Sequence, residues 1–160
     1  MHHSHVFVLA ASVLAVTACN PFHREPVTAV SRDVNLNARW RGQLATPAAL
    51  AGAVQINGTA SMQPGKSIED TMLSLNIANA TPGGVHPWQV HRGQCGADEG
   101  IFGTAAAYRP VKIGDDGRGG SGTTVPMATP TYGNYFVTVF ASAANPETVV
   151  ACGNLAPPVR

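Results

Sequence analysis

The chain has few charged residues, no long hydrophobic run and no recognisable catalytic serine among its 160 residues. Only 12% of the residues are charged and the formal net charge is +1. No broad basic surface is therefore available to neutralise phosphates, and we expect no nucleic-acid partner. A hydrolase finds no support either, because no serine of the mature domain lies in a nucleophile-elbow context. These serines are Ser61, Ser67, Ser74, Ser121 and Ser142.

The one marked apolar segment, Val6 to Val16, is too short to cross a bilayer as a helix, which needs about twenty residues. It is followed by "VTAC", with small residues before Cys19. This pattern resembles bacterial lipoprotein signals, although histidines replace the usual Lys or Arg. The resemblance implies that residues 1–18 are removed and that Cys19 is acylated. Asn20 after the cysteine favours the outer membrane of the cell envelope. The alternative is a buried amino-terminal helix, but no helical period continues beyond Cys19.

Residues 19–38 are predicted to be the lipidated cysteine and a flexible tether, because the stretch is polar, contains two prolines and shows no sustained period. Residues 39–160 then form one domain with 44% hydrophobic content across the chain to supply its core. The membrane, reached through the lipid on Cys19, is the only partner that the sequence indicates. No protein partner is indicated.

Once Cys19 is acylated, Cys95 and Cys152 are the only cysteines left. The signal sends them to an oxidising compartment, where such a pair is expected to form a disulfide. The alternative is two buried free thiols.

Short runs with an apolar residue at every second position predict strands, and the 17 glycines and 12 prolines argue against long helices. Trp40 and Trp88 lie in such runs and are expected to be buried. The glycine-rich segment 114–122 is expected to be a hairpin connection. About eight strands predict an all-β Greek-key flattened barrel or sandwich. The expected strands are Trp40–Leu44, Val54–Met62, Thr71–Ile77, Pro87–His91, Pro110–Ile113, Gly122–Met127, Tyr135–Phe140 and Val149–Leu155.

The segment "GGVHPWQVHRGQCG" contains His86 and His91, the only histidines beyond the tether. In an extended Pro87–His91 segment, Gln89 and His91 face one side while the apolar residues face the other. Imidazole suits copper and zinc, but a metal site normally needs three or four ligands. His86 and His91 are therefore candidate metal ligands in an incomplete set, and copper is the possible cofactor. Asp98 follows in "GADEG", a pattern typical of solvated turns.

Two stretches of the chain resemble known families. "HPWQVH" with a nearby Cys95, together with "VVACGNL", resembles the Cu/Zn superoxide dismutases. "VHRGQCGADEG" and "YFVTVFASAANPE" resemble chordin-type (CHRD) domains equally closely. The likeness covers about Arg39 to Leu155. It implies an eight-stranded Greek-key barrel, a copper site, and a disulfide between the cysteine after the histidines and the cysteine of the final "ACG".

The dismutase pattern is not matched at the positions that catalysis needs. A copper-ligand position falls on Gln89, a second on Phe140, and the position of the anion-guiding arginine on Val149. The region expected to hold a zinc loop contains no histidine. We therefore expect a non-catalytic module with a structural or binding role. The alternative is a copper-binding protein or weak superoxide dismutase that uses His86 and His91, with Asp98, Met127 or a partner completing the site.

Overall fold

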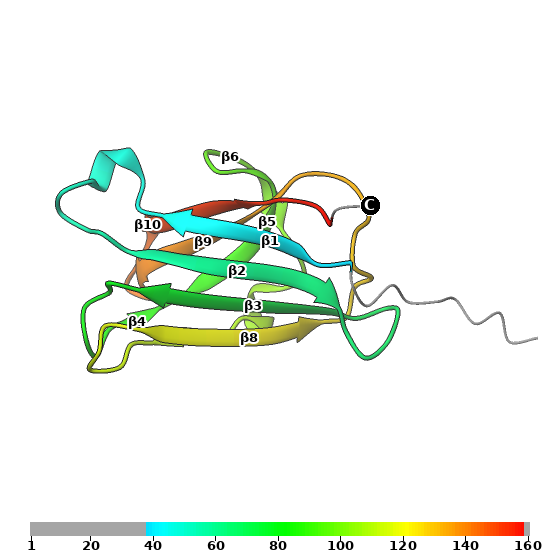
Figure 1. Ribbon diagram of the computed structural model, residues 1–160, viewed down its shortest axis with the longest axis horizontal. Helices are drawn as coiled ribbons and strands as arrows, with labels where there is room; N and C mark the ends of the chain where they lie inside the picture. Colours follow the sequence, from blue (N-terminus) through cyan, green and yellow to red (C-terminus); the bar gives the residue numbers. More distant parts are fainter. Residues whose placement is uncertain (1–37, 159–160) are drawn as a thin grey trace, which may run out of the picture. The chain divides into compact units, whose positions relative to one another are not determined.

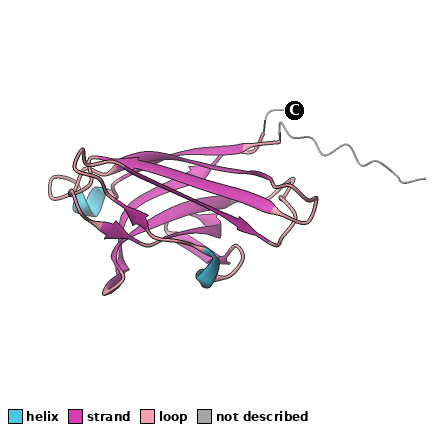
Figure 2. Ribbon diagram, turned by 90° about the horizontal axis from the view of Figure 1, so that it is seen from below, coloured by secondary structure: helices cyan, strands magenta, loops and turns pink. Residues whose placement is uncertain are grey.

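The computed structural model describes residues 38–158. The expected signal peptide, Cys19 and nearly all of the expected tether lie outside the described residues. Within this part of the chain, no helix has the length and apolar character needed to cross a membrane. The only helical elements described are two 3-10 turns, η1 (Ala48–Leu50) and η2 (Ala105–Ala107), which lie in connections between strands (Figure 2).

Ten strands account for most of the fold, and eight of them form one antiparallel sheet with the order β6-β5-β9-β10-β1-β2-β3-β8 (Figure 1). The remaining two strands, β4 and β7, form a separate two-stranded sheet. The expectation of an all-β protein is confirmed. The strands are β1 (Trp40–Ala45), β2 (Asn57–Pro64), β3 (Thr71–Ala78), β4 (Val85–His86), β5 (Trp88–Gln94), β6 (Ala97–Ile101), β7 (Val111–Lys112), β8 (Gly119–Val125), β9 (Tyr135–Ser142) and β10 (Asn145–Leu155).

The large sheet is curled into a partly closed barrel, and the small sheet bridges two of its strands, because β4 contacts β9 and β7 contacts β8. Strand β4 is separated from β5 only by Pro87, and its partner β7 returns to β8 through a turn in which Gly114 N–H donates to the Arg118 carbonyl at 2.8 Å. Along the large sheet, three connections join strands that are not neighbours: β3 to β5 through β4, β6 to β8 through β7, and β8 to β9. Such crossings are typical of the predicted Greek-key topology.

The barrel interior is filled by the inward-facing residues of the alternating strands, as the two-residue period predicted. In β3, for example, Leu73, Leu75 and Ile77 are buried. Trp40 and Trp88 are each 1% exposed, which confirms their expected burial. Each indole N–H also has a backbone partner, because Trp40 donates to the Pro130 carbonyl at 2.9 Å and Trp88 to that of Arg109 at 2.8 Å. These two hydrogen bonds tie long connections to the core.

Several strand limits differ from the sequence prediction for local reasons. Strand β2 begins at Asn57 rather than Val54, because the Val54 N–H is used in a turn and donates to the Leu50 carbonyl at 3.1 Å. Strand β8 begins at Gly119, inside the glycine-rich segment expected to be only a connection. Glycine fits there because neighbouring chain segments approach closely: a Cβ on Gly119 would lie 2.5 Å from the Lys112 carbonyl oxygen.

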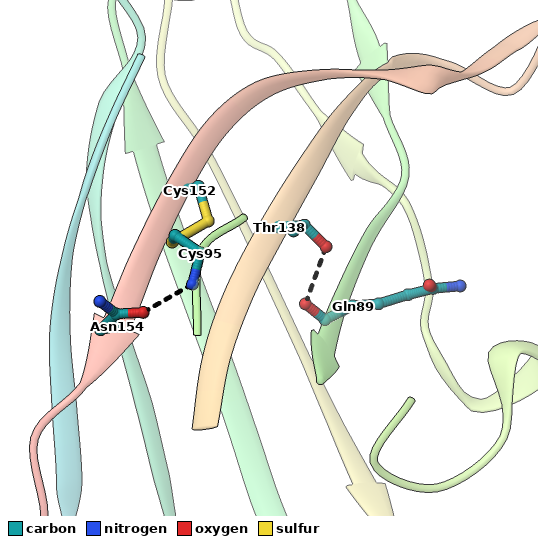
Figure 3. The surroundings of a disulfide bond; sticks show 5 residues. All are labelled: Gln89, Cys95, Thr138, Cys152 and Asn154. Carbon is teal, nitrogen blue, oxygen red and sulfur yellow. Dashed lines mark hydrogen bonds between the residues drawn. A yellow bond between two sulfur atoms is a disulfide. The ribbon is translucent and has the colours of Figure 1, made fainter. Parts of the chain in front are cut away.

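A disulfide joins Cys95, in the turn after β5, to Cys152 in β10 (Figure 3). The two Cα atoms lie 6.1 Å apart, within the usual range for this bond. The Cys95 N–H also donates to Oδ1 of Asn154 at 2.9 Å. The predicted pairing is therefore confirmed, and a hydrogen bond connects the same two segments.

Candidate functional site

The expected polar face of the histidine segment lies on the outside of the barrel. In β5, Trp88 and Val90 are buried in the core, whereas Gln89 and His91 point to the other face. Strand β9 pairs with β5 so that His91 is opposite Phe136 and Gln89 is opposite Thr138. The rings of His91 and Phe136 are in contact, with centroids 5.3 Å apart. The alternation predicted from the sequence is confirmed.

A groove of about 690 Å³ lies over this outer face. It brings together three positions compared with the dismutase pattern, His91, Phe140 and Val149, although they come from β5, β9 and β10. Asp98 and the two disulfide cysteines, also singled out by the sequence, line the same groove. Apolar side chains dominate its walls, and the disulfide forms part of its lining. The lining residues are Ala45, Thr46, Pro47, His91, Cys95, Gly96, Asp98, Phe136, Thr138, Phe140, Val149 and Cys152.

Both ring nitrogens of His91 already have partners. Nδ1 lies 2.9 Å from Oδ1 of Asp98, and Nε2 lies 3.1 Å from Oε1 of Gln89. The His91 side chain is only 10% exposed. The carboxylate accepts a hydrogen bond from Nδ1–H, while the Gln89 amide can turn to donate or accept according to the state of Nε2. A metal could bind this imidazole only by displacing one of these partners.

Asp98 is placed by β6, a strand that the sequence analysis missed. The Gly100 backbone N–H donates to Oδ1 of Asp98 at 2.7 Å and is the largest influence lowering the pKa of this carboxyl, with His91 adding to the effect. The sequence does contain a signal for the hairpin. Cys95 and Gly96 separate two short runs, and a two-residue connection with a glycine at positive φ is typical of a tight hairpin.

His86 lies apart from this groove. It is buried in β4, and its Nδ1 lies 3.0 Å from the Phe140 carbonyl oxygen. In a neutral imidazole whose Nδ1–H donates to that carbonyl, Nε2 carries a lone pair. This nitrogen is buried and has no hydrogen-bond partner among residues 38–158. His86 does not line the groove that contains His91, so the structure does not bring the two candidate ligands around one cavity.

The residues around His91 do not fit the copper ion that the dismutase resemblance implies. Gln89 and Thr138 are neutral, Phe140 and Val149 are apolar, and Asp98 is bonded to His91. Copper in such a site prefers imidazole ligands. Over residues 38–158, no three or more His, Cys, Asp or Glu side chains gather in a way that could hold a metal. Met127 lies in the connection after β8 and does not line the groove.

The chain matches no family model and no curated protein.

Proposed function

We propose that this protein is a lipoprotein of the bacterial envelope whose β domain resembles Cu/Zn superoxide dismutase or CHRD domains but acts as a binding module. Support for the resemblance comes from the Greek-key crossings of the barrel and from the disulfide that joins the segment after β5 to β10. In this proposal the lipid on Cys19 attaches the protein to the outer membrane. The domain itself has no catalytic role.

The observation that carries the proposal is the lining of the groove over β5, β9 and β10. The dismutase pattern has a metal ligand and an anion-guiding cation at two positions of this lining, and here both positions hold apolar side chains, Phe140 and Val149. His91 is held by Gln89 and Asp98 rather than left free for a ligand. A mostly apolar groove with a few fixed polar groups, of a size between about 300 and 1,000 Å³, is typical of small-molecule sites. The groove therefore favours an apolar ligand of small-molecule size.

Copper titration of the purified mature chain tests the proposal. We expect no stoichiometric copper binding that depends on His91, and no superoxide turnover above that of free copper. The restoring variant Gln89→His with Phe140→His should bind copper more tightly, because it adds imidazoles beside His91. Gln89→Leu with Phe140→Leu is the matched control and should gain nothing. Dismutase activity of the unmodified chain, lost in His91→Ala, would contradict the proposal.

A copper-handling protein is the second candidate, and it is favoured by the buried Nε2 of His86. The Phe140 carbonyl orients this imidazole through Nδ1, as backbone carbonyls commonly do for metal-binding histidines. Copper binding that is abolished by His86→Ala and unaffected by His91→Ala would support this candidate over a binding module that uses the groove. Binding that is unaffected by either substitution would argue against both histidines as ligands.

A further inference from the structure

The exposed large apolar side chains of the described residues gather at one end of the barrel. Three of them, Ile68, Met127 and Tyr132, lie in connections between strands, and Met72 lies at the start of β3. Only Val85 lies elsewhere, at the opposite end of the strands. Exposed apolar groups that cluster in this way mark interaction surfaces more often than isolated ones do.

Two connections form this end, the turn 65–70 between β2 and β3 and the loop 126–134 between β8 and β9. Both lie where β1 begins, and the described chain also ends there after β10 (Figure 1). Cross-strand pairing also places the two connections at the same end, because Thr71, the first residue of β3, is opposite both Pro64 at the end of β2 and Val125 at the end of β8. We call this surface the tether end, defined by residues 65–70 and 126–134 and the start of β1.

The loop 126–134 is fixed to the barrel by side-chain hydrogen bonds. Thr71 Oγ1 donates to the Met127 carbonyl at 2.7 Å and lies 2.9 Å from Oγ1 of Thr129. The indole N–H of Trp40 donates to the Pro130 carbonyl at 2.9 Å. Tyr132, at the outer part of this supported loop, is nonetheless 82% exposed. A tyrosine held out in this way suits the boundary between water and lipid, where aromatic rings with a polar tip are enriched.

The covalent connection to Cys19 enters the domain at the same end. Trp40 is the first residue of β1, so a lipid on Cys19 would keep the tether end nearest the bilayer on average. Three exposed cations, Arg39, Arg41 and Lys66, lie near this end together with two acidic residues, Glu69 and Asp70, so positive charge is in excess by one. This small excess of positive charge beside apolar side chains favours a surface that carries anionic headgroups over a neutral one.

We propose that the tether end is a lipid-contacting surface, which inserts Ile68, Met127 and Tyr132 into the headgroup region of an anionic bilayer. Together with the lipid on Cys19, this contact would fix which way the groove faces relative to the bilayer. The orientation rests on the proposed lipid anchor at Cys19. The contact with lipid does not, because it depends only on side chains of the folded domain.

The test uses the mature chain with Cys19→Ser, which carries no lipid, and vesicles of phosphatidylethanolamine and phosphatidylglycerol. Co-sedimentation should show weak binding that decreases with added salt. The double variant Ile68→Ser with Tyr132→Ser should lower the partition coefficient by about tenfold, because two apolar groups are lost from the interface. Val85→Ser is the matched control, since it removes a comparably exposed apolar residue from the opposite end, and it should bind like the parent.

Equal binding by the parent and the double variant would overturn the proposal, and so would an absence of vesicle binding by the parent. A dimer of the parent in solution that the double variant abolishes would assign the surface to a second copy instead. Thermal unfolding of each variant establishes that the fold is kept. Lipidation is tested separately by the mass of the envelope-derived protein, so failure of the anchor and failure of the lipid contact give different results.

Discussion

Replacing both disulfide cysteines with serine, Cys95→Ser with Cys152→Ser, tests how far a covalent link stabilises this barrel. The double change leaves no unpaired thiol, so its effect is that of the lost bond. The bond joins the turn between β5 and β6 to β10 across 57 residues of sequence. Strands β5, β9 and β10 are also hydrogen-bonded in series, so the native pairing can persist without the bond.

The expected magnitude follows from the length of the loop that the bond closes. For a sequence separation of 57 between the two cysteines, the chain-entropy relation gives about 4 kcal/mol of destabilisation. A domain of this size is typically stable by about 5–15 kcal/mol. The double variant is therefore expected to fold with a small margin. For a urea dependence of about 2 kcal/mol/M, the unfolding midpoint should fall by about 2 M.

Urea unfolding followed by tryptophan fluorescence measures the effect, because Trp40 and Trp88 are both in the core. Asn154→Ala is the matched control. It removes the side chain that accepts from the Cys95 N–H and keeps the disulfide, so it should cost only about 1 kcal/mol. A free energy of unfolding for the double variant within about 1 kcal/mol of the parent would refute the entropic reasoning.

Three further predictions concern other parts of the chain. Cys19→Ala should abolish processing and membrane attachment in cells, as followed by fractionation and mass spectrometry; unchanged attachment would exclude the lipid anchor. The lowered pKa of Asp98 means that its stabilisation is present above the unfolded value of about 4 and is lost as the pH falls through the folded value. Asp98→Asn should therefore weaken the dependence of the free energy of unfolding on acid pH. The change should be less than about 1 kcal/mol, because the group is exposed. Gly153→Ala should cost about 1–3 kcal/mol in urea unfolding, because the added Cβ meets the carbonyl of Gln43 on the neighbouring strand.

The architecture could be predicted because burial imposes a two-residue period on strands with one face in the core. The runs around Leu73 and Val90 show this period, and both strands formed where it was present. Strand β8 was partly missed because its glycines carry no such pattern. They are required by the close approach of neighbouring strands, a tertiary property that the local sequence does not record. Strand β6 was missed because its acidic residues are equally typical of a solvated turn.

The candidate site could be predicted only as far as each strand fixed the direction of its own side chains. The alternation in β5 correctly placed Gln89 and His91 on one face. The partner of His91 could not be predicted, because Asp98 reaches it only through the hairpin of β6. For His86, the proline that follows it interrupts the strand, so neither its direction nor its bond to the Phe140 carbonyl followed from spacing.

The contacts of β6 show which bonds hold one wall of the groove in place. The disulfide and the Cys95 N–H bond to Asn154 hold the start of the hairpin on β10. The Asp98 bond to His91 holds β6, the second strand of the hairpin, on β5. A metal ligated by residues of several strands would supply cross-links of this kind, and here a covalent bond and hydrogen bonds supply them. Phe140 and Val149 line the groove with apolar surface between strands that these bonds cross-link.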